Sequence, residues 1–437
     1  MRLSTSEIAA AVDGVVHGPE VEIDGATQDS RAAKPGQLFV PLVAERDGHD
    51  FIEKALSSGA PAYLTHEEVA VAGGTAVRVE DTAAALTRLG AAARQRIAAP
   101  VVGITGSVGK TSTKDLLAGA TAAHLITHQS VKSFNNEIGV PLTLLNIPDD
   151  TELAIVEMGA RGIGHIALLC SMASPTVGIV TTVAGAHMGE FGSVENIALA
   201  KGELVEGLPA DGLAVLNGDN PLVAAMASRT SAPVMTFGGS TSNDVIVESI
   251  ALDQELRATF TIATDWGRVV ARPPTRGAHM ASNTAAAVGA ALWLGVPLDV
   301  VEAGIAATEV SPWRMDVQRS VSGAVIINDS YNANPTSMHG ALDSLGRLEH
   351  QRKIAVLGYM AELGDGEQED HQSVRVAAQS VGAEVVAVGT DLYGLDPVSI
   401  EDVPSLLAPI NDEVAILVKG SRSAGLEILA ETLLTSE

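Results

Sequence analysis

The chain has 437 residues, 46% of them hydrophobic, and is therefore long enough for two or three domains with separate cores. Its net charge of −26 argues against a nucleic-acid-binding protein, and the lack of a long apolar run or of a signal-peptide core after Met1 indicates a cytoplasmic protein without a membrane span. Cys170 is the only cysteine, which excludes an intrachain disulfide, and its apolar neighbours favour a core residue over a catalytic thiol.

The first hundred residues predict short strands and two helices. A capping box at residues 4–7 precedes a short apolar helix at residues 8–12, and residues 81–96 have a second helical pattern. The sequence Ala-Ala-Pro at residues 98–100 is typical of a linker. We therefore expect a small α/β domain at residues 1–97.

A glycine-rich turn follows a β-branched pair at residues 101–102. Residues 103–111 are Gly-Ile-Thr-Gly-Ser-Val-Gly-Lys-Thr, and a helical segment follows them. Glycines let backbone N–H groups converge on phosphate oxygens, the Lys110 ammonium can reach the β and γ phosphates, and the Thr111 hydroxyl can ligate Mg²⁺. The turn thus predicts an ATP site made of Gly106, Ser107, Val108, Gly109, Lys110, Thr111 and Ser112.

Beyond this turn, short apolar runs alternate with helical patterns, which predicts a mainly parallel sheet with helices on both faces. The runs lie at residues 153–156, 177–183, 213–216 and 234–237. Residues 245–264 instead alternate apolar and polar side chains before a turn at 265–267, which indicates an antiparallel extension. Together with a helix at 279–294, these elements predict a central α/β domain of the phosphate-loop type at residues 98–309.

A second series of strands and helices follows. Its apolar runs lie at residues 324–328, 354–357, 384–388 and 415–418. Their spacing predicts a C-terminal Rossmann-like domain at residues 310–437, so the fold class expected for the whole chain is three-domain α/β.

Two polar residues follow strands of the central sheet. Glu157 ends one predicted strand, and the carboxyl edge of an open α/β sheet is where ligands bind, so this carboxylate could hold Mg²⁺ rather than be a solvated strand-end residue. His187 would emerge at the same edge, where a neutral imidazole can join a metal shell. A lone histidine is otherwise more often structural.

The phosphate turn has an unusual spacing, because its leading glycine is residue 103 and not residue 104. The pattern G-x-T-G-S-x-G-K-T resembles the loop of the Mur ligases, the ATP-dependent amide-forming enzymes of peptidoglycan precursor synthesis. The resemblance runs in family order from about Ser30 to Arg422. It includes residues 28–31, 47–51, 133–143, 277–283, 311–315, 328–338, 356–364 and 418–423.

The resemblance implies an enzyme that uses ATP and two Mg²⁺ ions. The implied metal ligands are Thr111, Glu157, His187 and a carbamylated Lys201, and the implied catalytic residues are Lys110, Glu157, His187, Lys201 and Arg314. On the ATP, Arg314 would neutralise phosphate charge, Asn283 would contact adenine and Asp329 would contact the ribose side. For Lys201, a partly buried amine has a lowered pKa and reacts with CO₂ in its neutral form, whereas the alternative is an ordinary surface lysine.

The same resemblance implies where the other substrates bind. Ser30 and Arg31 would hold the uridine diphosphate end of the precursor, and Asn135 and Asn136 either border the substrate channel or form a turn. The remaining implied substrate-binding residues are Asn332, Asn334, Lys419, Ser421 and Arg422. Trp313 departs from the family pattern, because glycine often precedes the arginine there.

Within the family, the segments after residue 328 are most similar to the member that joins UDP-N-acetylmuramoyl-tripeptide to D-alanyl-D-alanine through an acyl phosphate. We expect a monomer with this activity. The alternatives are the Mur ligase that adds the third amino acid and a nucleotide-binding protein without ligase activity.

Overall fold

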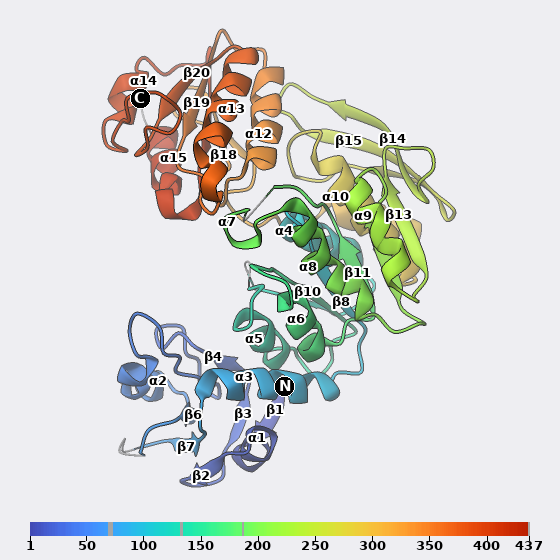
Figure 1. Cartoon of the computed structure of the whole chain (residues 1–437), viewed down its shortest axis with the longest axis vertical. Coiled ribbons are helices and arrows are strands. Elements are labelled where there is room, and N and C mark those ends of the chain that lie inside the picture. The colour runs from blue at the N-terminus through green and yellow to red at the C-terminus, as the bar shows by residue number, and fades with distance from the viewer. Residues whose placement is uncertain (69–72, 132–133, 186–187, 436–437) are drawn as a thin grey trace.

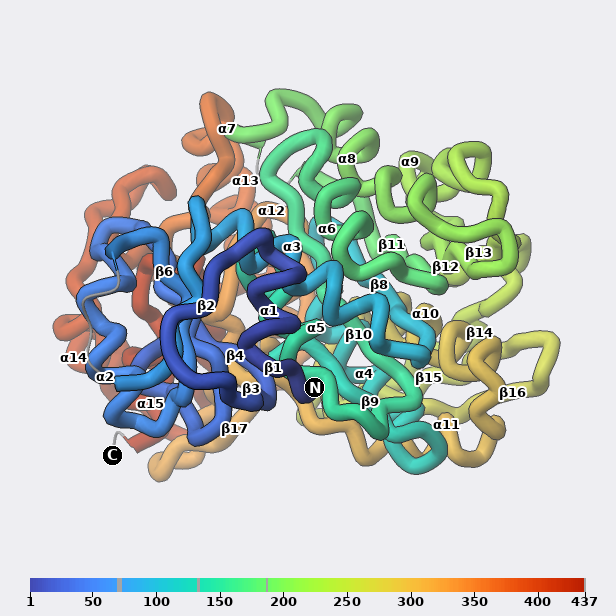
Figure 2. Tube along the Cα trace, turned by 90° about the horizontal axis from the view of Figure 1, so that it is seen from below, coloured from blue at the N-terminus to red at the C-terminus, as the bar shows by residue number. Residues whose placement is uncertain are grey.

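The computed structural model describes residues 1–68, 73–131, 134–185 and 188–435, and it confirms the three-domain α/β fold. In Figure 1 the N-terminal domain lies at the bottom, the central domain in the middle and the C-terminal domain at the top, on a curved path. Seen from below in Figure 2, the N-terminal domain lies in front of the C-terminal one. Strands β14 (Val245–Leu252), β15 (Ala258–Thr264) and β16 (Gly267–Ala271) lie at the right-hand end of the central domain. Within the described residues, no helix combines the length and apolarity needed to cross a membrane.

The N-terminal domain contains a five-stranded sheet of order β2-β7-β6-β5-β4 and a separate β1-β3 pair. Its capping box is present, since the Ser4 hydroxyl accepts a hydrogen bond from the Glu7 N–H, and the helix begins at Thr5. Its elements are β1 (Arg2–Ser4), α1 (Thr5–Val12), β2 (Val15–His17), β3 (Glu22–Asp24), β4 (Ala26–Thr27), β5 (Leu38–Phe39), η1 (Gly48–Phe51), α2 (Ile52–Ser57), β6 (Ala62–Thr65), β7 (Thr75–Arg78) and α3 (Thr82–Gln95).

The central domain is built on a nine-stranded sheet of order β16-β15-β14-β13-β12-β11-β8-β10-β9. It is parallel from β9 to β14, and β15 and β16 add the expected antiparallel extension. The elements are β8 (Val101–Thr105), α4 (Lys110–Thr121), β9 (Thr127–Gln129), α5 (Gly139–Leu145), β10 (Leu153–Glu157), α6 (His165–Ala173), β11 (Val177–Val180), α7 (Met188–Phe191), α8 (Val194–Glu206), β12 (Leu213–Asn217), α9 (Pro221–Ala224), η2 (Ala225–Arg229), β13 (Val234–Gly238), β14 (Val245–Leu252), β15 (Ala258–Thr264), β16 (Gly267–Ala271), α10 (Met280–Trp293) and α11 (Leu298–Ala306).

The C-terminal domain has a five-stranded sheet of order β17-β18-β21-β19-β20, in which only the β17-β18 pair is antiparallel. Its elements are β17 (Asp316–Arg319), β18 (Val325–Asn328), α12 (Pro335–Arg347), β19 (Arg352–Leu357), η3 (Gly364–Gly366), α13 (Glu367–Ser380), β20 (Ala383–Ala387), α14 (Val403–Leu407), β21 (Val414–Lys419), η4 (Arg422–Ala424) and α15 (Leu426–Thr435).

The uninterrupted apolar runs follow from burial of both faces of these sheets. In β10, Ala154 and Val156 belong to the core shared with the N-terminal domain, and the alternating residues Leu153 and Ile155 belong to the core on the opposite face. Cys170 is buried in α6, and burial raises the pKa of its thiol to about 12, which confirms a core residue.

Candidate active site

The phosphate loop is held by the end of the neighbouring strand β11. Gly106 has a φ of +151°, and a Cβ there would lie 1.9 Å from Thr181 Oγ1, so only glycine fits. The Ser107 N–H donates to the Thr182 carbonyl (2.9 Å), and the Val108 N–H donates to the Thr182 hydroxyl (3.2 Å). These two hydrogen bonds and the close approach at Gly106 therefore fix the shape of the loop.

The second loop glycine lies under helix α10. Gly109 has a φ of +88°, and a Cβ there would lie 2.3 Å from the Asn283 side-chain oxygen. Gly109 also immediately precedes α4, which begins at Lys110. The structure thus places Asn283 against the phosphate loop, and its contact with adenine stays a prediction.

A cavity of about 400 Å³ lies over this loop, between the central and C-terminal domains. That volume is within the range of small-molecule sites. Of the residues expected from the sequence, the cavity is lined by Ser107, Val108, Gly109, Lys110, Thr111, Ser112, Asn135, Glu157, Asn283, Arg314, Asp329, Asn332, Asn334 and Lys419. His187 lies outside the described residues.

A chain of hydrogen bonds crosses the cavity wall from one domain to the other. Arg314 Nη2 donates to Thr111 Oγ1 (2.8 Å), and Thr111 Oγ1 donates to Glu157 Oε2 (2.7 Å). Asn135 Nδ2 donates to the other carboxylate oxygen of Glu157 (2.8 Å). Because Glu157 is only 1% exposed, it is not the solvated strand-end glutamate considered as the alternative.

Two lysines come close together beside the loop. Lys110 Nζ donates to the Gly106 carbonyl (2.7 Å); burial lowers the pKa of Lys110, the Glu157 carboxylate opposes this shift and the Arg314 guanidinium adds to it. Lys201 lies on α8 and is 2% exposed. Burial, and secondly the charge of Lys110, lower the pKa of Lys201 well below its usual value, which excludes an ordinary surface lysine.

Lys419 holds the C-terminal side of the cavity in place. It is buried, forms an ion pair with Asp329 and donates to the Asn332 carbonyl (2.9 Å). The same aspartate accepts a hydrogen bond from the Met315 N–H (3.0 Å), next to Arg314. Lys419 therefore positions Asp329 at the cavity. The sequence resemblance implied instead that Lys419 binds substrate, and that contact stays a prediction.

Several expected substrate residues have other partners. Asn136 accepts from the Gly139 N–H (2.9 Å) at the start of α5, and Asn334 caps α12 by accepting from the Ser337 N–H (2.9 Å). The Ser421 hydroxyl accepts from the Ala361 N–H (2.9 Å). These geometries make Asn136, Asn334 and Ser421 supports of local structure, and their substrate contacts stay predictions.

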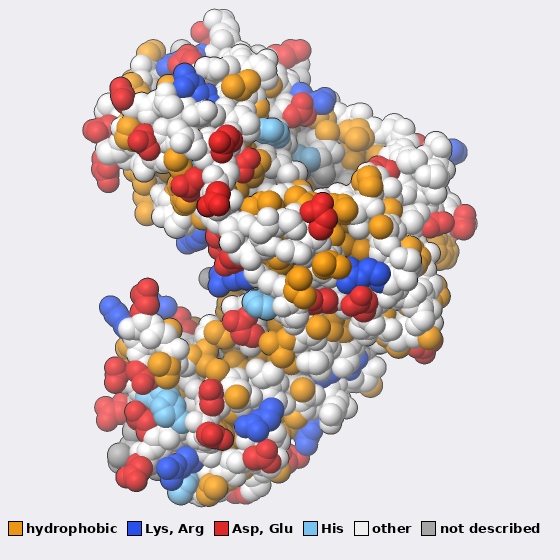
Figure 3. Space-filling model, in the orientation of Figure 1, with side chains coloured by type: hydrophobic (Ala, Val, Ile, Leu, Met, Phe, Trp, Pro, Cys, Tyr) orange, Lys and Arg blue, Asp and Glu red, His pale blue; other side chains and the backbone are white. Residues whose placement is uncertain are grey.

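The remaining expected residues lie apart from the cavity. Arg422 pairs with Glu427 (2.7 Å), and its guanidinium lies 4.3 Å from the centre of the Trp313 ring. Ser30 is buried in the N-terminal domain, and exposed Arg31 pairs with Asp29 through two hydrogen bonds of 2.9 Å. Figure 3 shows the molecule hollowed between the N-terminal and C-terminal domains, with Lys and Arg side chains at the edges of the hollow.

Sequence reasoning assigned no role to Thr182, Tyr331 and Asp115, although each helps to shape the site. Thr182 holds the loop, and the ring of Tyr331 lies 4.2 Å from the Arg314 guanidinium. Asp115 on α4 accepts from the Ser311 N–H (2.8 Å), which ties the segment before Arg314 to the phosphate-loop helix. Thr182 and Tyr331 both follow strands, which was an available signal, whereas the contact of Asp115 depends on how the domains pack.

The way this cavity is built gives the class of protein. One domain contributes a phosphate loop at the carboxyl edge of a parallel sheet, and the next contributes an arginine that reaches the loop, an arrangement of nucleotide-dependent α/β enzymes that bind their ligand between domains. Comparison with known families narrows the class. The Mur ligase middle domain matches residues 104–291, and the family described as Mur ligase, glutamate ligase domain, matches residues 313–423. The chain belongs to the Mur ligase family, and it is a ligase.

Relatives and solved structures match the chain over all or nearly all of its length. The UDP-N-acetylmuramoyl-tripeptide–D-alanyl-D-alanine ligase of Bacillus subtilis (strain 168) is 33% identical, over 100% of this chain and 99% of that protein. A crystal structure of MurF from Acinetobacter baumannii has a TM-score of 0.89 at 29% identity, over 99% of both chains. MurF from Thermotoga maritima in complex with ADP has a TM-score of 0.81 at 25% identity, over 94% of this chain and 96% of that one.

Proposed function

We propose that this chain is an ATP-dependent ligase that joins UDP-N-acetylmuramoyl-tripeptide to D-alanyl-D-alanine and forms ADP and phosphate. The observation that supports this most is the contact of Arg314 with the phosphate loop, across a cavity that two domains share. The full-length similarity to ligases of that name supports the same substrates.

ATP is proposed to bind with its triphosphate on the loop. The Thermotoga relative was solved with ADP, and the loop here offers backbone N–H groups, the Lys110 ammonium and the start of α4. Asn283 lies over the loop and Asp329 lines the other side of the cavity, so both can contact the nucleotide.

The reaction has two steps. A carboxylate oxygen of the tripeptide attacks the γ-phosphorus, and the bond to the β–γ bridging oxygen breaks to release ADP and leave an acyl phosphate. The dipeptide amine then attacks the acyl carbon, phosphate leaves and the amine loses its proton. Lys110 and Arg314 offset the charge on the transferring phosphoryl group, and the C-terminal domain excludes water that would hydrolyse the acyl phosphate.

The donor set beside the loop fits Mg²⁺, and we propose that two ions bind there. Glu157 and Thr111 offer the oxygen ligands that Mg²⁺ prefers, and Asn135 orients the Glu157 carboxylate. Bound Mg²⁺ supplies positive charge against the triphosphate oxygens. A carbamate on Lys201 would add an oxygen ligand, and His187 stays a predicted one.

The N-terminal domain is proposed to bind the uridine diphosphate end of the precursor through Ser30 and Arg31. Each of the three ranges expected from the sequence contains its own sheet, which supports domain limits near residues 97 and 309. The hollow in Figure 3 gives the long UDP-peptide a path from the N-terminal domain towards the phosphate loop.

The proposal is tested by phosphate release from ATP. Turnover is expected only when ATP, UDP-N-acetylmuramoyl-tripeptide and D-alanyl-D-alanine are all present. The control replaces the last two by the UDP-dipeptide and a diamino acid, the substrates of the ligase for the preceding step. Lack of stimulation by the tripeptide and dipeptide, or turnover with the control pair instead, would reject the assignment.

A further inference from the structure

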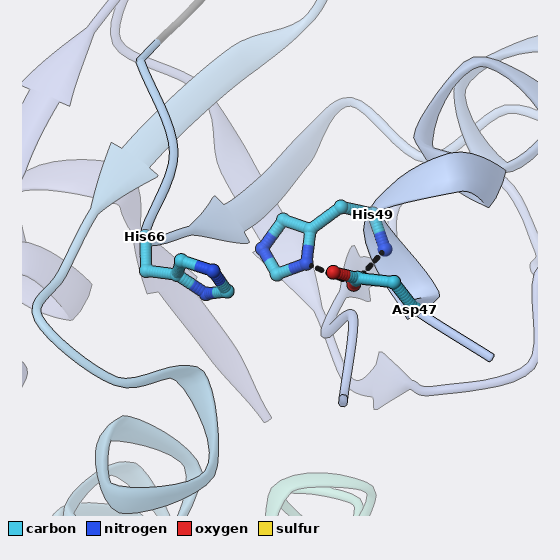
Figure 4. Close-up of side chains that lie close together, drawn as sticks. All are labelled: Asp47, His49 and His66. Atoms are coloured by element: carbon cyan, nitrogen blue, oxygen red, sulfur yellow. Dashed lines mark hydrogen bonds and ion pairs between the residues drawn. The ribbon is translucent and has the colours of Figure 1, made fainter. Parts of the chain in front are cut away.

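Three side chains with metal-ligand chemistry meet in the N-terminal domain, away from the phosphate loop. Asp47 caps η1, His49 lies in η1 and His66 directly follows β6. One ligand atom from each lies within 4.8 Å of the others. Figure 4 shows His49 between the other two, with one ring nitrogen facing Asp47 and the other facing the His66 ring.

Asp47 fixes the tautomer of His49. Its carboxylate Oδ1 lies 2.6 Å from His49 Nδ1 and also accepts from the His49 backbone N–H (3.0 Å). Because the same carboxylate oxygen already accepts the backbone N–H, the ring nitrogen that faces it is placed as a second donor. With Nδ1 as the donor to Asp47, the neutral ring keeps its lone pair on Nε2.

That lone pair has no protein partner. The His49 side chain is 3% exposed, and its buried Nε2 forms no hydrogen bond with any part of the chain that the structure describes. A buried polar atom without a partner is unfavourable and calls for an explanation. A second imidazole lies beside this nitrogen: the His66 ring centre is 4.2 Å from that of His49, at an interplanar angle of 70°. The two rings together can supply the ligands of a cation, which would give Nε2 a partner.

We propose that His49 and His66 bind a divalent transition-metal ion of the Zn²⁺ type, with Asp47 as the positioning residue behind His49. Imidazole nitrogen is a preferred ligand of Zn²⁺, Ni²⁺ and Cu²⁺, whereas Mg²⁺ prefers oxygen. A carboxylate on the far nitrogen of a ligating histidine is the usual support of such sites. Two protein ligands leave positions for water, so the ion exchanges with solvent.

The ion would join two separate segments. His49 belongs to η1, which leads into α2, and His66 directly follows β6, so a shared ion would fix η1 to the edge of the sheet. Binding to the folded protein alone raises its stability. The three residues of this site differ from those proposed for the ligase activity, although Ser30 and Arg31 belong to the same domain.

The test is metal binding by the full chain. Calorimetric titration with ZnCl₂ is expected to show a site that MgCl₂ does not fill, and ZnCl₂ is expected to raise the midpoint of thermal unfolding. His66→Gln should weaken this binding by at least roughly tenfold and remove the thermal shift. His17→Gln is the matched control, because His17 is an exposed histidine in the same domain.

Asp47→Asn tests the positioning role, since it keeps the side-chain size but removes the charge that holds His49. A loss of roughly 10- to 100-fold in Zn²⁺ affinity is expected. Co²⁺ should still bind to this variant, but its visible spectrum should differ from that of Co²⁺ bound to the wild type. His49→Gln is less informative because His49 is buried, so His66→Gln decides the question. Equal Zn²⁺ binding by the wild type and His66→Gln, or no Zn²⁺ binding by the wild type, overturns the proposal.

Discussion

A lysine that is 2% exposed, as Lys201 is, must either find a counter-charge or give up its proton. In the described parts of the chain no carboxylate forms an ion pair with it, and the nearby Lys110 charge lowers its pKa further. Lys201 is thus held towards the neutral amine, which is the form that attacks CO₂. The resulting carbamate is an anion, so it would turn repulsion between Lys201 and a cation into attraction.

We expect Lys201→Ala to lower kcat by roughly 10²-fold or more, because it removes a ligand from the proposed metal shell. A short-chain carboxylic acid added to the assay should restore part of the rate by replacing the missing oxygen ligand. Lys353→Ala, in the C-terminal domain, is the control and should leave the rate unchanged. A fully active Lys201→Ala variant would rule out the carbamate.

Residues of the site could be predicted from the sequence where their position depends on local structure. Glu157 is an example, because a strand end and the adjacent loop are both local patterns. The bond from Arg314 to Thr111 joins residues 203 positions apart and depends on how two domains pack. His66 belongs to no motif, and only the sheet brings it to His49.

At the scale of elements, the apolar runs predicted the strands well because both faces of the sheets are buried. The predicted ends of the strands were less accurate. The run at 177–183 indicated a strand to residue 183, but β11 ends at Val180, since Thr181 and Thr182 turn to bind the phosphate loop. Residues 245–264, for which the alternation indicated an antiparallel extension without its inner turn, form two strands because the chain also turns at Leu256, with a φ of +62°.

The join between the phosphate loop and α10 gives an element-scale prediction. Gly109→Ala should abolish ATP binding, because the new Cβ would overlap the Asn283 side chain and force the loop away from α10. The measurement is calorimetric titration with ATP. Gly295→Ala is the control. Gly295 has a similar φ of +85°, so the backbone strain of an added Cβ is alike, but no atom lies within 4 Å of that Cβ and no side chain is displaced. Equal loss in both variants would show that the Asn283 contact is irrelevant.

At the scale of the whole molecule, the three domains are not joined equally. One core cluster extends from Met1 to Ala232, so the N-terminal and central domains pack as one body. The sheet of the C-terminal domain has its own two cores, to which the central domain adds Leu256. Independent cores favour movement of the C-terminal domain over the nucleotide, which would bring Arg314 to the phosphates and Asp329 to the ribose side.

Where α7 meets η3, the two bodies touch backbone to backbone, and this contact gives the whole-molecule prediction. A Cβ on Gly189 would lie 3.1 Å from the Gly364 Cα, and the Gly189 N–H donates to the Glu362 carbonyl (3.3 Å). Gly189→Val should therefore wedge the C-terminal domain away. Because a displacement of about 1 Å at reacting groups can cost roughly 10²-fold, kcat should fall by up to that factor while ATP binding to the intact loop is kept. Small-angle scattering should show a larger radius of gyration.

Gly366→Val is the control, because Gly366 lies in the same η3 segment but has open space around its Cβ. This variant should change neither kcat nor the radius of gyration. Unchanged kcat in Gly189→Val would mean that the contact between α7 and η3 does not set the domain arrangement.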